Sequence, residues 1–112
     1  MAIALNVFKT KTAEITSVET SIYTAPVGKS AIILMAQIAN ITNTSGTVTV
    51  SHYYSGTDTT TELIKDFTIP GNDSASAVTG KLVLEEGHQI KVTASNDNKF
   101  KITLSILESV NG

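Results

Sequence analysis

The sequence predicts an all-β protein, folded as a single antiparallel β-sandwich or a jelly-roll-like barrel of about eight strands. Threonine, isoleucine and valine make up about a third of the 112 residues, and these β-branched side chains favour strands over helices. Short segments in which apolar and polar residues alternate are separated by turn residues at regular spacing, which is typical of sandwiches and barrels. No segment shows the periodicity of an amphipathic helix. The length suits one domain with one core.

Residues 30–41 form the longest apolar run and are predicted to be a central strand. Both residue parities of this run are apolar, whereas a half-exposed strand would alternate with polar residues. One face is therefore expected in the core, and the other under a second layer of the chain or under another subunit. For the second case, the candidate interface residues on this run are Ile33, Met35 and Ile41.

The chain before this run is predicted to be an N-terminal strand or arm over residues 1–19. In residues 2–9 the apolar character alternates weakly from one residue to the next, so this segment is a candidate first strand. If the strand is unpaired in its own domain, it can reach a neighbouring subunit. Residues 12–18 and 20–24 are predicted as two further short strands. The latter ends at Pro26 and Gly28, where proline fixes the backbone and glycine permits a reversal.

The chain after this run is predicted to complete a sandwich over residues 20–108. The strand at 47–54 is expected to turn Val48 and Val50 inward, and the strand at 61–69 to place Leu63, Phe67 and Ile69 on one face. Residues 72–77 are expected to be a loop. Further strands are predicted at 81–85, at 89–95 and from 100 to 106, and the tail 109–112 is expected to fray.

Charge and composition exclude several classes of function. The formal net charge is −2 and only 16% of the residues are charged, with neither sign dominant. This balance argues against binding to nucleic acid or to an anionic membrane. The absence of cysteine removes disulfides and thiolate metal sites. The longest apolar run is about half a membrane span, and the first residues lack the basic start of a signal peptide, so a soluble protein made in the cytoplasm is expected.

Two motifs suggest chemistry, but an ordinary structural explanation is preferred for each. Gly28-Lys29-Ser30 resembles the end of a phosphate-binding loop, yet position 23 is tyrosine where that motif needs glycine, and a strand follows where a helix is needed. A plain turn is expected. His52 and His88, the latter preceded by Glu85 and Glu86, suggest a metal site, but such sites need three or four converging ligands. Solvated turn residues are expected.

Other polar residues are assigned no catalytic, cofactor-binding or metal-binding role. Asp58, Glu62 and Asp66 recur every four residues, but the spacing of a calcium loop is missing, so a solvated sheet edge is preferred. No serine or threonine has the setting of a nucleophilic triad. Tyr53 and Tyr54 are candidate interface residues and, as an alternative, a stacking platform for a sugar ring, with one of the two expected in the core.

Four segments, covering most of residues 20–108, together resemble small β-sandwich virion proteins of tailed bacteriophages. They are IYTAPVGKSAI at 22–32, IPG at 69–71, GKLVLEEGHQIKVTAS at 80–95 and LSILE at 104–108. The chain departs from that pattern at Ala25, where valine is usual, and at His88, where aspartate is usual. Gly87 is kept, so the turn before position 88 is preserved.

The resemblance implies a structural role in the virion. It implies a capsid decoration (cement) protein or tail accessory protein that is not an enzyme, has no cofactor and stabilises the particle by protein–protein contacts. Its expected partners are identical subunits, with a trimer favoured, and the major capsid or tail proteins. Its expected location is the virion, after synthesis in the host cytoplasm. The alternative is a fibre-attachment or host-glycan-binding module.

Overall fold

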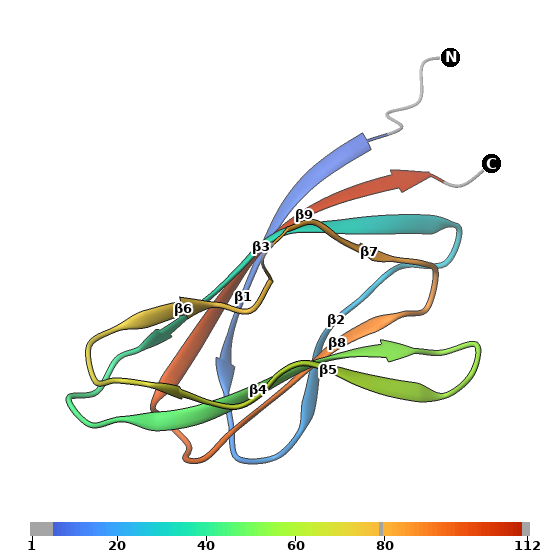
Figure 1. Ribbon diagram of the computed structural model, residues 1–112. Helices are drawn as coiled ribbons and strands as arrows, with labels where there is room; N and C mark the ends of the chain where they lie inside the picture. The colour runs from blue at the N-terminus through green and yellow to red at the C-terminus, as the bar shows by residue number, and fades with distance from the viewer. Residues whose placement is uncertain (1–5, 79, 111–112) are drawn as a thin grey trace.

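The computed structural model describes residues 6–78 and 80–110, which fold into two antiparallel sheets packed face to face (Figure 1). The prediction of an all-β sandwich is therefore confirmed. The strands in the described residues are β1 (Asn6–Ile15), β2 (Thr20–Thr24), β3 (Lys29–Asn40), β4 (Gly46–Tyr54), β5 (Thr59–Ile69), β6 (Ser74–Ser76), β7 (Leu82–Leu84), β8 (Gln89–Ala94) and β9 (Phe100–Val110).

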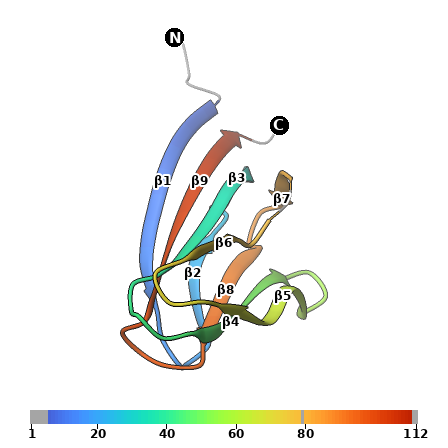
Figure 2. The same cartoon turned by 60° about the vertical axis from the view of Figure 1, so that its left-hand side comes forward.

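The two sheets are built from strands that are distant in the sequence. Sheet A has the order β1-β9-β3-β6, with β7 also paired to β3, and sheet B has the order β2-β8-β4-β5. Figure 2 shows β1, β9 and β3 side by side in one layer, with β2, β8, β4 and β5 in the other. The domain is elongated, with extents of 52 × 29 × 21 Å.

The core lies between the sheets and is made mainly of β-branched and leucine side chains. Strands β8 and β9 follow the predicted alternation, since every second residue is buried and the residues between are half-buried or exposed. Sheet A contributes Ile33, Ile38, Ile102, Leu104 and Ile106, and sheet B contributes Val48, Val50, Ile90 and Val92, all at 2% exposure or less. Burial of this apolar surface is the main force that holds the layers together.

Strand β3 is a central strand, as predicted, but its inward face changes parity along its length. Ala31 and Ile33 point into the core at its start, whereas Ala36 and Ile38 do so further on. A register shift against β9 between Ile33 and Met35 inserts one extra residue. Such a bulge moves the following side chains to the opposite face. Strict alternation predicts that residues 33 and 38 point to different faces of the sheet. Because of the bulge, both point into the core.

Strand β1 replaces the two short strands predicted at 2–9 and 12–18. It runs unbroken from Asn6 to Ile15 and pairs with β9 in the same chain at all ten positions. Residues 2–5 of the predicted first strand lie outside the described residues. A single strand is possible here because an edge strand with one face in water accommodates polar residues such as Thr10 and Thr12.

Strand β5 departs from simple alternation at two register shifts against β4. Asp66 has a φ of 48°, and Ile64, rather than Leu63, lies opposite the buried Val50. Leu63 and Ile64 are both half-buried against the core. Phe67, expected on the same face as Leu63 and Ile69, is instead 46% exposed. The expectation was wrong for Phe67, because bulges cannot be recognised from alternation alone.

Two further boundaries differ from those expected. Residues 74–76, expected in a loop, form the short strand β6, which pairs with residues 37–39 of β3. Strand β9 continues through Ser109 and Val110, which had been assigned to a frayed tail. The turn before β3 is as predicted, because the Lys29 N–H donates to the Pro26 carbonyl oxygen and Gly28 adopts a φ of 78° that glycine tolerates.

Candidate functional site

A buried carboxylate joins the two sheets at the end of the domain where β9 finishes. Glu108 follows Phe100, Ile102, Leu104 and Ile106 in the inward series of β9, so the alternation of the strand directs its side chain into the interior. The Glu108 side chain is only 1% exposed. Its burial could not be predicted from the sequence, since a glutamate near the end of a strand gives no signal of burial by itself.

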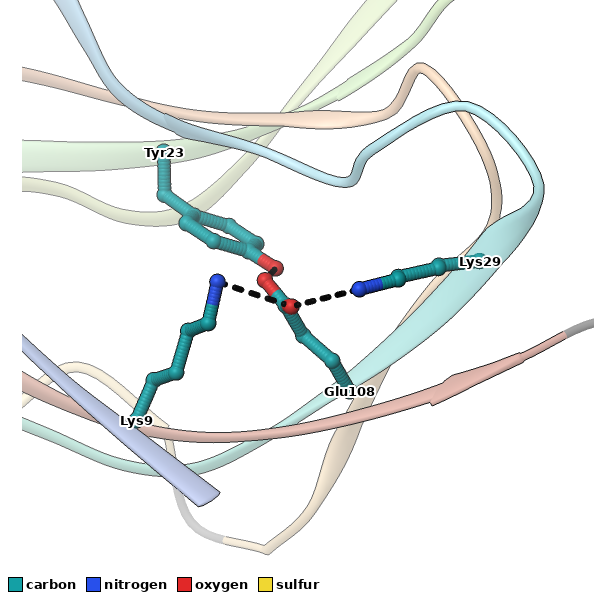
Figure 3. Close-up of polar contacts among 4 residues, drawn as sticks. All are labelled: Lys9, Tyr23, Lys29 and Glu108. Carbon is teal, nitrogen blue, oxygen red and sulfur yellow. Dashed lines mark hydrogen bonds and ion pairs between the residues drawn. The ribbon is translucent and has the colours of Figure 1, made fainter. Parts of the chain in front are cut away.

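Three side chains from three other strands surround this carboxylate (Figure 3). Tyr23 of β2 donates a hydrogen bond of 2.6 Å from Oη to Glu108 Oε2. The Nζ of Lys9 on β1 lies 3.1 Å from Glu108 Oε1, and the Nζ of Lys29 on β3 lies 3.8 Å from the same oxygen. Both lysines are partly exposed, at 50% and 35%. We call these four residues the Glu108 cluster.

The electrostatics keep the carboxylate charged and the phenol neutral. Burial acts to raise the pKa of Glu108, but the hydrogen bond from Tyr23 and the ammonium groups of Lys9 and Lys29 outweigh it, so its pKa lies below the ordinary value. Burial, together with the neighbouring Glu108 charge, raises the pKa of Tyr23 well above its ordinary value. Both carboxylate oxygens face protein partners, so the cluster is suited to fastening strands together.

The two histidines meet at a second polar cluster. His52 Nε2 lies 3.0 Å from His88 Nδ1, and the Glu85 N–H donates to the same His88 Nδ1 at 3.3 Å. His88 Nδ1 therefore acts as an acceptor, which places the donor of the pair on His52 Nε2. The Tyr54 ring packs against the His88 ring with centroids 4.1 Å apart. Burial, and then the neighbouring His88, lower the pKa of His52, while Glu85 opposes them.

The histidine expectation needs correction in one respect. His88 was expected in a solvated turn, but it is 3% exposed and its carbonyl oxygen accepts from the Ala25 N–H at 2.9 Å. Beside it is an open groove of about 500 Å³ lined by Ser30, Tyr54, Ser55, Gly56, Glu85, Glu86 and His88. Within residues 6–78 and 80–110, no three His, Asp or Glu side chains converge as a metal site would require.

The residues of the suspected phosphate loop are occupied by contacts within the fold. The Gly28 N–H donates to Glu86 Oε1 at 2.5 Å, and Lys29 points to Glu108. Among the acidic residues at 58–66, Asp58 accepts a hydrogen bond from the Tyr53 hydroxyl group. Glu62 and Asp66 lie exposed on the edge strand β5. These contacts agree with an ordinary turn at residues 28–30 and with a solvated sheet edge at residues 58–66.

The five candidate interface residues are distributed over different parts of the domain. Ile33 is fully buried in the core of its own chain, and Met35 is half-buried opposite Ser105 on the outer side of sheet A. Ile41 is 52% exposed just beyond the end of β3, and Tyr54 is 40% exposed at the far end of β4. Tyr53 is half-buried, with Lys91 Nζ 4.3 Å from its ring centroid. They form no single surface, and neither tyrosine belongs to the buried core.

An exposed row of apolar side chains crosses the outer face of sheet A. Strand register places Phe8 opposite Leu107, Leu107 opposite Ile32, and Ile32 opposite Val83. Phe8 is 75% exposed and Val83 is 55% exposed, with the two middle residues half-buried. We call these four residues the apolar row. Sequence alternation suggested neither its length nor its direction, because it depends on register between strands that are distant in the chain.

A shallow groove adjoins the apolar row on the same face. It has a volume of about 310 Å³ and is lined by Phe8, Lys9, Thr10, Leu34, Ser105 and Ile106. Contiguous exposed apolar surface of this kind commonly marks a contact site. The described residues include no helix long and apolar enough to cross a membrane.

No protein-family model and no curated protein sequence matches the chain. Solved structures share its fold. A chain of Bacillus endospore appendages, described as a novel family of disulfide-linked pili, aligns with a TM-score of 0.60 and 12% identity over 96% of this chain and 88% of that chain. A chain of the acidic stable capsid of Helicobacter pylori bacteriophage KHP30 aligns with a TM-score of 0.54 and 12% identity over 97% of this chain and 90% of that chain.

A third structure contains the fold as part of a larger chain. In infectious bursal disease virus, Gx strain, the TM-score is 0.56 with 11% identity, over 96% of this chain but 32% of that chain. This chain therefore spans about a third of the viral one. At such identities the likeness shows a common fold, a β-sandwich that occurs in proteins of pili and of virus capsids.

Proposed function

We propose that this protein is a structural component of a tailed-phage virion, a capsid decoration or tail accessory protein that stabilises the particle by protein–protein contact. The observation that carries the proposal is the apolar row, a continuous band of Phe8, Leu107, Ile32 and Val83 on the outer face of a rigid sandwich. A protein that works alone in water gains nothing from such a band, whereas an assembly subunit gains buried area from it.

Two further observations support an assembly role. The Glu108 cluster and the His52–His88 pair both connect strands within the domain. Such connections suit a subunit that has to keep its conformation in an assembled particle. The fold also occurs in a phage capsid and in pili. The sequence resemblance to small virion proteins of tailed phages points the same way. The proposed partners are copies of the same chain and a major capsid or tail protein.

The proposal is tested on phage particles. Mass spectrometry of purified virions should detect the protein at a fixed copy number. Particles of a phage that lacks the gene should bind the purified protein when it is added. They should then regain resistance to heat or to osmotic shock. Absence from the virion, together with no binding to the depleted particles, would refute the proposal.

A matched pair of variants tests the surface itself. Val83→Lys places a charge in the apolar row and is expected to weaken binding to depleted particles at least tenfold. Phe67→Lys changes a comparably exposed side chain on sheet B and should bind like the unaltered protein. Equal binding by both variants would assign the contact to another surface.

The polar groove beside Tyr54 favours a second function, recognition of a host glycan. Its lining combines an aromatic ring with Glu85, Glu86 and two serines, which are groups that stack on sugar rings and bind sugar hydroxyls. The Tyr54 ring already packs on His88, so less of it is free for a sugar. Binding on a glycan array that is lost in Tyr54→Ala would support this function, and an empty array would remove it.

A further inference from the structure

The groove beside Tyr54 carries two negative charges that no cation in the described part of the chain neutralises. Glu85 and Glu86 line it, and both are exposed. Neither forms an ion pair with a described residue, since the ion pairs there all involve Glu108. Lys29 follows the turn that Glu86 contacts, but its ammonium group points to Glu108. The volume of about 500 Å³ leaves room for a group of opposite charge.

A buried donor without an acceptor is an independent sign of a ligand in the same groove. His88 is 3% exposed, and its Nδ1 accepts from the Glu85 N–H and from His52 Nε2. The ring proton of His88 therefore lies on Nε2, and no described residue accepts it. Glu108 Oε1 is the one described side-chain oxygen or nitrogen that is closed off from solvent without a hydrogen bond. His88 Nε2–H therefore opens into the groove that His88 lines.

The third group in the groove is the ring of Tyr54. One side of the ring packs on His88, with centroids 4.1 Å apart, while 40% of the residue stays exposed. Gly56 lies close beside it, because a Cβ at this position would lie 3.1 Å from Tyr54 Cε1. The face of an aromatic ring attracts organic cations, most often the guanidinium group of arginine.

Contacts within the chain hold the walls of the groove in place. Gly87 has a φ of 82°, and its N–H donates to the Ala25 carbonyl oxygen at 3.0 Å. Glu86 Oε1 accepts from the Gly28 N–H at 2.5 Å, and Glu86 Oε2 has no partner among the described residues. A Cβ at Gly87 would lie 2.9 Å from Ser55 Oγ, so the turns before β8 and after β4 lie directly against each other. A site formed before binding loses little entropy when it is filled.

We propose that this groove binds an arginine side chain of the protein on which the chain assembles. A guanidinium group is planar, positively charged and equipped with five N–H donors. It donates to the carboxylates of Glu85 and Glu86, and its plane stacks on Tyr54. A main-chain carbonyl oxygen of the same partner segment is the acceptor that His88 Nε2–H lacks.

Other ligands match fewer of these groups. The ammonium group of lysine is a compact, strongly hydrated charge without a flat face for the Tyr54 ring. A metal ion needs three or four converging ligands, and no three His, Asp or Glu side chains converge in the described part of the chain. An acidic sugar or a phosphate group faces like charges on Glu85 and Glu86. A neutral sugar leaves both of these charges without a partner.

The sequence limits where the arginine can come from. All eight basic residues of the chain are lysines, so a second copy cannot supply a guanidinium group. The partner is therefore a different protein, and its assignment as the major capsid or tail protein rests on the proposed function. Arginine is common among the few residues that dominate the binding energy of an interface. The contact thus adds a charged anchor to the apolar row.

A pair of small probes tests the charge requirement on the full chain. In an NMR titration, N-acetyl-arginine amide should shift the backbone signals of Glu85 and Gly56 until they saturate. N-acetyl-citrulline amide has nearly the same shape but no charge, and it should bind at least tenfold more weakly. Equal binding of the two probes overturns the proposal. Shifts caused by methyl glucoside and not by the arginine probe would assign the groove to a glycan and also overturn it.

Matched variants test the carboxylate. Glu85→Gln removes an exposed ionised acceptor and is expected to weaken binding of the arginine probe at least fivefold. Glu62→Gln makes the same change at an exposed position of β5 and should bind the probe like the unaltered chain. Equal affinity of the Glu85→Gln variant and the unaltered chain overturns the assigned site.

Phage particles that lack the protein test the partner. Glu85→Lys reverses the charge at the groove and is expected to weaken binding to these particles at least tenfold, whereas Glu62→Lys should bind like the unaltered protein. Unchanged binding by Glu85→Lys would overturn the assignment of the arginine to the particle. Detection of the protein in purified virions depends on none of these results, so the two proposals can fail separately.

Discussion

The Tyr23 hydroxyl donates a hydrogen bond of 2.6 Å to Glu108 and so connects β2 of sheet B to β9 of sheet A. The same carboxylate attracts Lys9 and Lys29 from β1 and β3. One buried charge therefore holds four strands together at the end of the sandwich where the apolar core finishes. The energetic value of the arrangement can be measured with conservative substitutions.

Tyr23→Phe and Glu108→Gln are each expected to lower the free energy of unfolding by about 1.5–3 kcal/mol, the range for a hydrogen bond to a charged group. For Glu108→Gln the loss of stability stays in this range because Lys9 and Lys29, which lose their partner, are partly exposed and can be solvated. Urea unfolding of both variants and of the double variant gives the coupling energy, which should exceed 0.5 kcal/mol in magnitude. Additive effects would contradict the proposed direct link.

Acid should weaken the protein through the same carboxylate. The pKa of Glu108 is lowered in the folded state relative to its ordinary value of 4.5, so its contribution is fully present above that value. It is lost as the pH falls through the lower folded pKa, since the unfolded chain binds the proton first. Unfolding free energies measured between pH 6 and pH 3 should decline less steeply in Glu108→Gln. An identical decline in that variant would count against this assignment.

His52 should produce a separate loss of stability at milder pH. The pKa of His52 in the folded state is lowered from its ordinary value of 6.5 by burial and by His88. Stability is therefore present above 6.5 and falls as the pH drops below it, because the unfolded chain takes up the proton first. His52→Gln removes this group, so the profile should be flatter between pH 6.5 and pH 5. An unchanged slope would show that His52 does not contribute in this way.

Adjacent isoleucines on β3 test the bulge. Ile33 is fully buried, whereas Ile32 is half-buried on the outer face. Ile33→Ala is expected to cost about 2–5 kcal/mol of unfolding free energy through lost burial and the cavity left behind, and Ile32→Ala less than half as much. Thermal or urea unfolding of the pair gives the comparison, and a larger cost at Ile32 would reverse the assigned faces.

Gly71 is held against the backbone of the β3–β4 loop. A Cβ at this position would lie 2.3 Å from the carbonyl carbon of Asn43, so the backbone must move to accept any side chain. Gly71→Ala should lower the free energy of unfolding by about 1–3 kcal/mol, the usual cost of overpacking. Gly80→Ala, with no neighbouring atom within 4 Å, is the control and should be close to neutral in the same unfolding assay.

Much of the fold was predictable from the sequence because strand formation is a local property. The β-branched composition and the alternation at 89–95 and 100–106 predicted strands that the structure confirms. The turn at Gly28 was also predictable, since its backbone requirement is set by neighbouring residues. Errors arose where an extra residue changed the alternation, as at Ile33 and Phe67, because a bulge is defined only against the partner strand.

The sequence by itself determined that this chain forms strands, where most of them turn, and that it lacks cysteine. Only the tertiary structure decided which polar groups meet. Tyr23 and Glu108 are 85 residues apart, and His52 and His88 are 36 apart. The apolar row likewise exists only because β1, β9, β3 and β7 align in one register. Local propensity acts over a few neighbouring residues, whereas these contacts depend on the pairing order of whole strands.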